Sequence, residues 1–264
     1  MMKLSSDQSA AMALALLNAR ASLIAIPPFT ESDPELGVAE GYAIQQHLLA
    51  LLLEQGETLA GYKLGLTSLP MQELLGVDQP DFGPIFSSTI YRDGATVSVS
   101  DFIAPRVEAE IAVVLKKDLT GPHCTPAQVY QATDGLLAAI EIVDSRITDW
   151  KIKIADTIAD LASGGAIALS STLIPVDACD PRLIGMVFTK NGEIIATGAG
   201  AAALGDPLAA VAWLANTLAP LGVTLRSGSV IMTGALHAMA PISPGDTFRA
   251  EFAHLGPITL RIAE

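Results

Sequence analysis

The sequence is poor in several features that define large classes of protein. It has two cysteines, Cys124 and Cys179, which stand in no metal-ligand spacing, so we expect free thiols rather than a disulfide framework. No apolar run approaches the ~18–20 residues that a membrane-spanning helix needs. The apolar stretch at residues 10–17 follows Asp7 and the capping spacing Ser5-x-x-Gln8, which favours a helix start over a signal peptide. These features predict a cytoplasmic protein.

Charge is also scarce, and positive charge most of all. Only 16% of the 264 residues are charged, and 15 basic against 28 acidic residues give a net charge of −13. This balance argues against nucleic acid or an anionic membrane as a partner, although it permits a small anionic substrate. Half of the residues are hydrophobic, which is apolar even for a globular protein and indicates surface buried in a homo-oligomer.

The pattern of apolar residues predicts helices first and strands afterwards. Amphipathic helices are expected over residues 6–24 and 38–55, and Asp206-Pro207 predicts the start of another that runs to Leu218. Asn191-Gly192 predicts a type I′ hairpin. Strands are expected near residues 97–100, 107–115, 138–143, 184–190, 193–197, 229–233, 247–252 and 257–262. We therefore predict an N-terminal helical segment (1–60) leading into a mostly β domain (61–264) that forms one structural unit.

Two short motifs match well-known signatures only weakly. Residues 198–203 fit a dinucleotide-binding fingerprint, but the strand before them is the return arm of a hairpin, so a close-packed turn is favoured. Asp81-Phe-Gly83 occurs without the other kinase motifs and carries no kinase signal.

The most informative stretch is residues 106–115, which begins Arg-Val-Glu-Ala-Glu. With the two-residue period of a strand, Glu108 and Glu110 point to one face, about 7 Å apart, and repel each other unless a cation or a proton lies between them. Glu141 lies within a separate apolar run, where an unpaired charge is costly. Three carboxylates on apolar strands suit Mg²⁺ or Mn²⁺. The alternative is that Glu-x-Glu is the solvent face of an edge strand.

Four longer motifs resemble those of one known family. They are Gly61-Tyr-Lys-Leu-Gly-Leu-Thr-Ser68, Gly76-Val-Asp-Gln-Pro-Asp-Phe-Gly83, Arg106-Val-Glu-Ala-Glu110 and the stretch from Glu141 to Lys153. Together they resemble the 2-oxopent-4-enoate hydratases of the fumarylacetoacetate hydrolase superfamily, which act in catechol meta-cleavage pathways. The resemblance covers nearly the whole chain and implies an α+β fold, a mixed β-sandwich roll with an N-terminal helical part.

The resemblance also implies roles for individual residues. Glu108, Glu110 and Glu141 match the family's ligands for a divalent metal ion. Lys63 matches its active-site lysine, Asp81 an acidic residue near the substrate, and Ser163 a serine near the substrate carboxylate. Asp144 and Arg146 are expected to form a supporting ion pair.

Leu161 departs from the family, which usually has asparagine there. Loss of that amide removes a hydrogen-bond donor and an acceptor, so we expect alkyl-substituted or unsubstituted dienoates to be preferred over dicarboxylic ones.

The implied reaction is a metal-assisted hydration. The ion stabilises enolate charge while a 2-hydroxy-2,4-dienoate ketonises, and water then adds at C4 to give a 4-hydroxy-2-oxo acid. Three alternatives remain: a 4-oxalocrotonate-type decarboxylase, a C–C hydrolase, and a non-catalytic partner subunit that associates with other enzymes of the pathway. The hydrolase ranks third because it needs a His–Glu pair, and no histidine is expected near the acidic motifs, since His123 lies beyond the strand.

Overall fold

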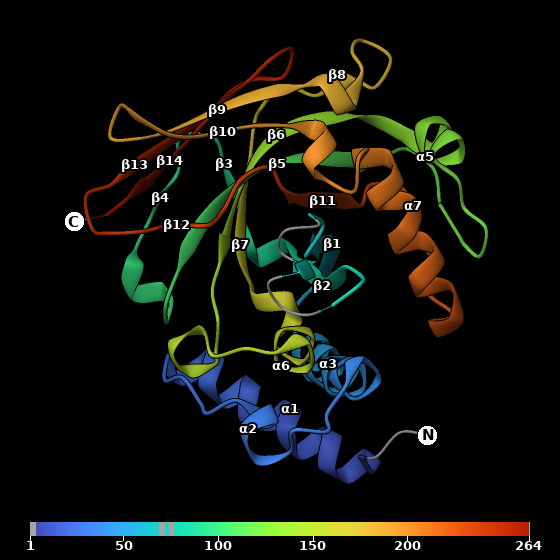
Figure 1. The fold of residues 1–264 in the computed structure, drawn as a ribbon, viewed down its shortest axis with the longest axis vertical. Helices are drawn as coiled ribbons and strands as arrows, with labels where there is room; N and C mark the ends of the chain where they lie inside the picture. The colour runs from blue at the N-terminus through green and yellow to red at the C-terminus, as the bar shows by residue number, and fades with distance from the viewer. Residues whose placement is uncertain (1–3, 69–71, 74–76, 264) are drawn as a thin grey trace.

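Two β-sheets occupy one part of the molecule and a layer of helices lies beneath them (Figure 1). The computed structural model describes residues 4–68, 72–73 and 77–263. Gly76, the first residue of one family motif, lies outside this part of the chain. The α-helices are α1 (Ser6–Ser22), α2 (Phe29–Ser32), α3 (Val38–Glu54), α5 (Pro126–Ala132), α6 (Ile154–Ala159) and α7 (Pro207–Leu218).

The larger sheet has nine strands and carries the acidic motifs. Its central order is β2-β1-β11-β5-β6-β7-β3, with β12 paired to β5 and β8 to β6; β1 runs parallel to β11 and β3 parallel to β7, while the other pairs are antiparallel. The strands are β1 (Leu59–Gly65), β2 (Asp81–Phe86), β3 (Ile90–Arg92), β5 (Arg106–Leu115), β6 (Thr133–Val143), β7 (Gly164–Leu169), β8 (Ile174–Pro175), β11 (Val230–Ala235) and β12 (Ala240–Pro241).

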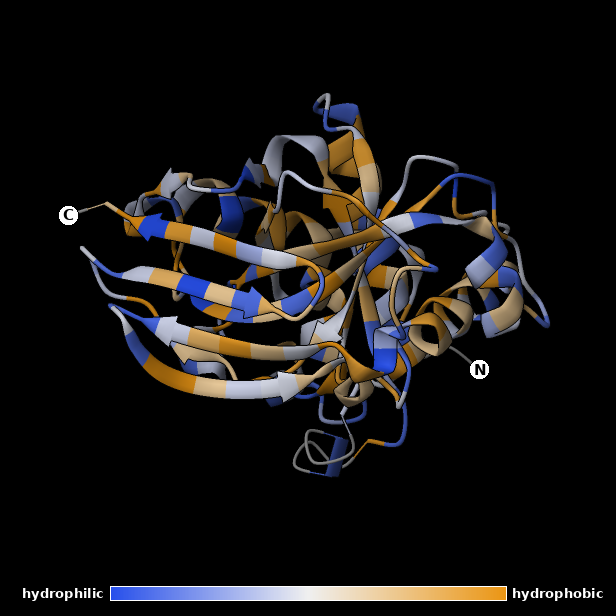
Figure 2. Ribbon diagram, turned by 90° about the horizontal axis from the view of Figure 1, so that it is seen from above, coloured by the Kyte–Doolittle hydropathy of each residue, from blue (hydrophilic) through white to orange (hydrophobic). Residues whose placement is uncertain are grey.

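A smaller sheet of five strands packs against the larger one. Its order is β10-β9-β13-β14-β4, formed by β4 (Thr96–Val97), β9 (Gly185–Lys190), β10 (Glu193–Ala199), β13 (Thr247–Phe252) and β14 (Gly256–Ile262). Hydrophilic and hydrophobic residues alternate along these strands (Figure 2), as expected for a sheet with one buried face. Phe188 and Phe248 of this sheet share the main core with Val107 and Ile111 of β5.

The two faces of β5 lie in different surroundings. Val107, Ala109, Ile111 and Val113 face the main core between the sheets, whereas Ala112 belongs to a separate apolar cluster. Glu108 and Glu110 share the Ala112 face because side chains alternate along a strand. The alternation predicted from the sequence is therefore confirmed.

The helical layer has its own core. Leu16 of α1 and Ile44 and Leu48 of α3 pack together with Phe86 and Leu161 from the rest of the chain. α1 begins as predicted, because Ser5 and Gln8 form a reciprocal capping box. In the part of the chain that the structure describes, no helix is long and apolar enough to cross a membrane.

Most of the predicted elements are confirmed. The hairpin at Asn191-Gly192 has positive φ at both residues, as a type I′ turn requires. The glycines of residues 198–203 are closely packed, since a Cβ on Gly200 would lie 1.9 Å from the Pro181 carbonyl oxygen. The strand predicted near residues 97–100 is wrong: β4 ends at Val97, and a 3₁₀ turn follows over Val99–Asp101.

Candidate active site

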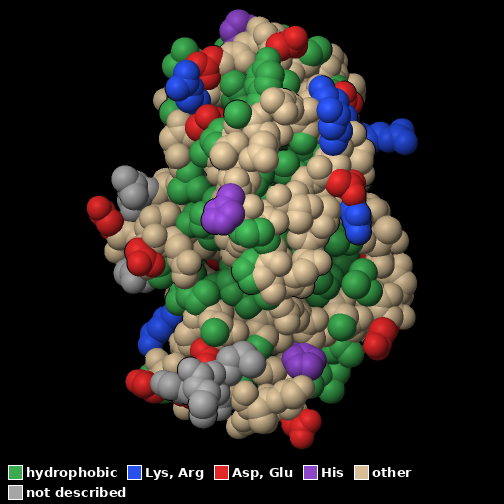
Figure 3. All heavy atoms as spheres, turned by 90° about the vertical axis from the view of Figure 1, so that its right-hand side faces the viewer, with side chains coloured by type: hydrophobic (Ala, Val, Ile, Leu, Met, Phe, Trp, Pro, Cys, Tyr) green, Lys and Arg blue, Asp and Glu red, His purple; other side chains and the backbone are tan. Residues whose placement is uncertain are grey.

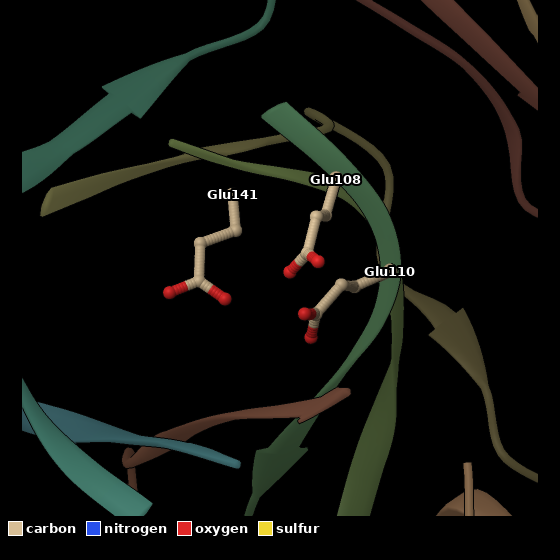
Figure 4. A group of neighbouring side chains, drawn as sticks. All are labelled: Glu108, Glu110 and Glu141. Carbon is tan, nitrogen blue, oxygen red and sulfur yellow. The ribbon is translucent and has the colours of Figure 1, made fainter. Parts of the chain in front are cut away.

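The three glutamates predicted as metal ligands meet on one face of the larger sheet. Glu108 of β5 lies directly opposite Glu141 of the antiparallel strand β6, and Glu110 lies two residues further along β5. One carboxylate oxygen from each residue lies within 4.8 Å of the other two. Figure 4 shows the three carboxyl groups pointing into the same space. The solvent-edge alternative is wrong, because Glu110 is 0% exposed.

Glu110 is fixed by the strand on the other side of β5. Its Oε2 accepts a hydrogen bond of 2.8 Å from the backbone N–H of Gly234 on β11. Gly234 has a φ of +109°, and a Cβ there would lie 2.0 Å from Thr67 Oγ1, so only glycine fits. One oxygen of Glu110 is thus held by the backbone, and the other is left to face the cluster.

The donor set of the site fits a divalent cation. Glu110 Oε1 and Glu141 Oε2 are buried and accept no hydrogen bond from any described residue. Burial, followed by the charge of Glu141, raises the pKa of Glu108 to about 8. Burial also raises the pKa of Glu110 and of Glu141. Buried carboxylate oxygens that accept no hydrogen bond and repel one another are the donors that a hard divalent cation binds.

Lys63 lies next to this cluster on β1, with 4% of its surface exposed. Its Nζ donates to the Ala162 carbonyl oxygen at 3.0 Å and lies 3.4 Å from Glu141 Oε1. Burial alone would lower the pKa of Lys63, but the surrounding carboxylates, Glu141 foremost, raise it above the ordinary value. Lys63 is therefore a fixed positive charge beside the acidic cluster, and not a solvated surface lysine.

Asp81 completes the polar set from β2. It lies opposite Gly65 in the β1–β2 pair, and a Cβ on Gly65 would lie 2.2 Å from Asp81 Oδ1. Its Oδ2 accepts from Thr157 Oγ1 at 3.2 Å, and the same hydroxyl lies 3.3 Å from Ser163 Oγ. Burial raises the pKa of Asp81, while Lys63 opposes the rise. A buried carboxyl group with a raised pKa that accepts a hydrogen bond from a hydroxyl is suited to proton transfer.

A turn with left-handed backbone conformation positions residues 161–163 in the site. Leu161, Ala162 and Ser163 all have φ between 52° and 57°, a conformation that few non-glycine residues adopt. This turn brings the Ala162 carbonyl to Lys63 and the Ser163 hydroxyl to Thr157. Leu161 lines the pocket next to Lys63 and also packs among the helices of the lower layer.

The expected ion pair between Asp144 and Arg146 is present but secondary. Their closest side-chain atoms lie 4.0 Å apart. The main partner of Arg146 is Asp160, which accepts from both its backbone N–H and its Nε. Asp144 instead accepts from the backbone N–H groups of Ile103 and Ala104. These groups support the loops around the site without reaching the acidic cluster.

His237 corrects the expectation that no histidine lies near the acidic motifs. Its Nε2 accepts a hydrogen bond of 2.9 Å from the backbone N–H of Ala109, between Glu108 and Glu110. Its Nδ1 lies 2.6 Å from the Ala238 carbonyl oxygen, so Nδ1 carries the proton. Burial lowers the pKa of His237, which favours this neutral form. Both ring nitrogens are therefore engaged, and His237 is not free to activate water as a C–C hydrolase would require.

The chain belongs to the fumarylacetoacetate hydrolase family. The family model for the fumarylacetoacetate hydrolase C-terminal domain matches residues 64–263, a range that begins one residue after Lys63 and contains Asp81, the three glutamates, Leu161 and Ser163. Among curated relatives, the chain is 44% identical to a 2-keto-4-pentenoate hydratase of Paraburkholderia xenovorans (strain LB400) over 88% of this chain and 87% of the relative. It is 42% identical to a 2-hydroxyhexa-2,4-dienoate hydratase of Comamonas testosteroni, over 94% and 95% of the two chains.

A solved structure supports the same assignment. The 4-oxalocrotonate decarboxylase of Pseudomonas putida G7, complexed with magnesium and adipate, superposes with a TM-score of 0.96 at 35% identity and covers 99% of this chain and 100% of that one. The expected fold, an α+β sandwich roll with an N-terminal helical segment, is therefore confirmed. The expectation of a divalent metal ion is also supported, because the acidic cluster fits an ion of the kind that this neighbour holds.

Proposed function

We propose that the protein is a metal-dependent hydro-lyase that adds water to 2-hydroxypenta-2,4-dienoate-type substrates in aromatic meta-cleavage catabolism. One observation carries the proposal: three glutamates, of which Glu110 and Glu141 are buried and each have an unpartnered oxygen, meet beside a buried lysine and a buried aspartate. The hydratase relatives support the reaction type. The product would be a 4-hydroxy-2-oxo acid.

The acidic cluster would hold the carboxylate end of the substrate through its ion. A divalent cation bound to Glu108, Glu110 and Glu141 would supply Lewis-acid stabilisation of negative charge at the substrate's 2-oxygen. Lys63 lies 3.4 Å from Glu141 and supplies a second positive charge that requires no reorganisation during the reaction. We assign to Lys63 the stabilisation of the negative charge that develops as the dienol becomes a ketone.

Asp81 is the group we propose for moving protons. Ketonisation takes the proton of the 2-hydroxyl and places one on the far carbon, after which water adds its hydroxyl at C4 and its proton at C3. Asp81 has a raised pKa and a hydrogen bond from Thr157, so it can hold a proton and release it within the site. Ser163, which shares Thr157 with Asp81, is proposed to bind the substrate. Leu161 is proposed as the apolar wall of the same pocket.

The second candidate is a decarboxylase that acts on 4-oxalocrotonate. The close superposition with the Pseudomonas putida G7 enzyme favours keeping it. Both reactions use the same end of the substrate and differ in whether a C–C bond is broken, so the placement of the glutamates does not separate them.

A direct assay separates the candidates. The purified protein with Mg²⁺ or Mn²⁺ is mixed with 2-hydroxypenta-2,4-dienoate, and loss of dienol absorbance is followed together with formation of 4-hydroxy-2-oxopentanoate. A parallel reaction with 4-oxalocrotonate measures release of CO₂. Hydration that is abolished by excess chelator is expected. Release of CO₂ without hydration would assign the decarboxylase, and inactivity on both substrates with either metal would favour the non-catalytic partner subunit.

We also propose that the protein works in the cytoplasm as a homo-oligomer, as a single structural unit in which residues 1–60 form the helical segment. Hydrophobic side chains form a broken band across the face seen in Figure 3, with most charged side chains around it. Such a face suits contact with another copy of the chain. We further propose association with other enzymes of the meta-cleavage pathway, because they would act on the substrate before it or on the product after it.

A further inference from the structure

Arg20 places a guanidinium group at the edge of the active site. It lies in the last turn of α1, and its side chain lines the pocket that also contains Lys63 and Glu141. It is half-buried, yet it forms no hydrogen bond or ion pair with any described residue. Burial lowers the pKa of Arg20 and the charge of Arg146 lowers it further, whereas the charges of Glu57, Asp160 and Asp144 oppose this fall. A half-buried guanidinium that donates to no described residue keeps its N–H groups available for an anionic group of a ligand.

Arg146 gives a useful contrast, because it lines the neighbouring cavity with Arg20. Its guanidinium donates to Asp160 and to the Gly164 carbonyl oxygen. Arg146 is therefore satisfied within the chain. Of these two guanidinium groups, only that of Arg20 is left for a ligand.

The space beside Arg20 leads away from the acidic cluster. Arg20, Thr89, Gly165 and Ala166 line both the pocket next to Lys63 and a second cavity of about 190 Å³. The two spaces therefore meet at Arg20. Near Lys63 the walls are apolar and include Ile85, Phe86, Leu161 and Ile167. A chain that starts at the glutamates would first pass apolar walls and then reach a free guanidinium.

We propose that Arg20 is a specificity-determining residue that binds a carboxylate at the far end of the substrate chain. The planar guanidinium suits bidentate binding of a carboxylate. The preferred substrates would then be 2-hydroxydienoates that carry a second, terminal carboxylate. This inference rests on the proposed function, since it places the reacting end of the substrate at the acidic cluster.

This proposal reverses the preference expected from Leu161 alone. Leu161 packs with Leu16 and Leu17 of α1, the helix that carries Arg20. The side chain of Leu161 therefore helps to pack α1 against the rest of the chain. The polar end of a substrate would contact Arg20 and not the apolar side chain of Leu161.

The test compares two substrates in four proteins. The wild type, Arg20→Met, Arg20→Lys and Arg182→Met are assayed with 2-hydroxyhepta-2,4-diene-1,7-dioate and with 2-hydroxypenta-2,4-dienoate, and the ratio of the two kcat/KM values is recorded. The wild type should favour the dioate. Arg20→Met should lower the ratio by about 10- to 100-fold, the effect expected from loss of a hydrogen-bonded ion pair. Arg20→Lys should recover part of this ratio, because lysine keeps the positive charge but cannot bind a carboxylate with two parallel hydrogen bonds.

Arg182→Met is the matched control. Arg182 is an exposed arginine that pairs with Asp180 and lines neither of the two pockets. It should keep the wild-type ratio. A second measurement needs no variant: 2-oxoheptanedioate should inhibit the wild type more strongly than 2-oxoheptanoate, which has the same reacting end and no second carboxylate.

The two proposals fail in different ways. If the wild type hydrates the pentadienoate but handles the dioate poorly, or if Arg20→Met leaves the ratio unchanged, the role of Arg20 is wrong and the proposed function stands. If neither dienoate is hydrated with Mg²⁺ or Mn²⁺, the proposed function itself is wrong.

Discussion

Glu110 lies at the most enclosed point of the acidic cluster, with one oxygen held by Gly234 and the other unpartnered among the described residues. Glu110→Gln keeps the shape and the acceptor for Gly234 but removes a negative charge. Mutation of a residue that only hydrogen-bonds to a metal ligand lowers metal affinity by roughly 10- to 100-fold. Loss of the negative charge of a proposed ligand should lower the affinity for Mn²⁺ by at least this factor. The thermal stability of the metal-free protein should not fall, because one of three mutually repelling carboxylates is gone.

Titration calorimetry with Mn²⁺ and thermal unfolding without metal check the two halves of this prediction. Glu193→Gln, at the exposed start of β10, is the control and should change neither result. Wild-type affinity for Mn²⁺ in Glu110→Gln would remove this residue from the ligand set.

Lys63 should act on the rate of the reaction more than on binding. Its positive charge lies where negative charge develops, so Lys63→Met should lower kcat by about 10²–10³-fold, as does removal of one preorganised donor in other enzymes. KM should change much less. Steady-state kinetics on the pentadienoate check this, with the exposed Lys117→Met as the control. A variant with normal kcat and a raised KM would make Lys63 a substrate-binding residue only.

At the scale of elements, the backbone between Glu108 and Glu110 lies at an interruption in the pairing of β11 with β5. The strand pairing shifts between Met232 and Ala235, and the His237 ring accepts the hydrogen bond that the Ala109 N–H would otherwise lack. His237→Ala leaves that donor without its partner, which costs about 1–3 kcal/mol. Because Ala109 lies between two proposed metal ligands, we expect metal affinity to fall about tenfold or more as well.

His237→Gln is the informative partner of this variant, since an amide oxygen can accept the same bond. It should recover most of the metal affinity, as measured by titration with Mn²⁺. If the alanine variant loses stability but binds Mn²⁺ as the wild type does, His237 supports the fold and does not position the ligands.

The elements also show which parts of the fold could be predicted. β5 and α1 were predictable because alternation and a capping box are local signals. β1 and β2 were missed: Gly61-Tyr-Lys-Leu-Gly65 combines two glycines and a lysine in a strand, and β2 is buried along its whole length and shows no alternation. The glutamates were found from local sequence. His237 was not, because its contact with Ala109 spans 128 residues and no sequence pattern marks it.

At the scale of the whole molecule, the helical layer fixes the sheet that carries the site. The Gln45 amide of α3 donates 2.8 Å hydrogen bonds to the carbonyl oxygens of Phe82 and Ile158. Tyr42, also on α3, stacks on Phe82 with ring centroids 4.6 Å apart. Phe82 follows Asp81 directly, so α3 positions the strand that supplies the proposed proton-transfer group. The N-terminal helices thus hold the strand of Asp81 in place, although the three proposed metal ligands all lie in the larger sheet.

The whole molecule should also respond to pH through its metal site. In the metal-free fold the pKa of Glu108 rises from an ordinary value of 4.5 to about 8, because of burial and then the charge of Glu141. Between these values the folded chain binds more protons than the unfolded chain. The free energy of unfolding of the metal-free protein should therefore fall as pH rises through this window.

Metal binding should show the opposite trend, because the ligands must be ionised. If one proton is released per ion, apparent affinity for Mn²⁺ should rise about tenfold per pH unit up to about pH 8. Calorimetric titrations between pH 6 and 9, in two buffers of different ionisation enthalpy, measure the affinity and the protons released. Saturating Mn²⁺ at 100 times its Kd should add about 2.7 kcal/mol of stability at each pH. An affinity that does not change between pH 6 and 8, with no proton release, would mean that the three glutamates are already ionised in the metal-free protein.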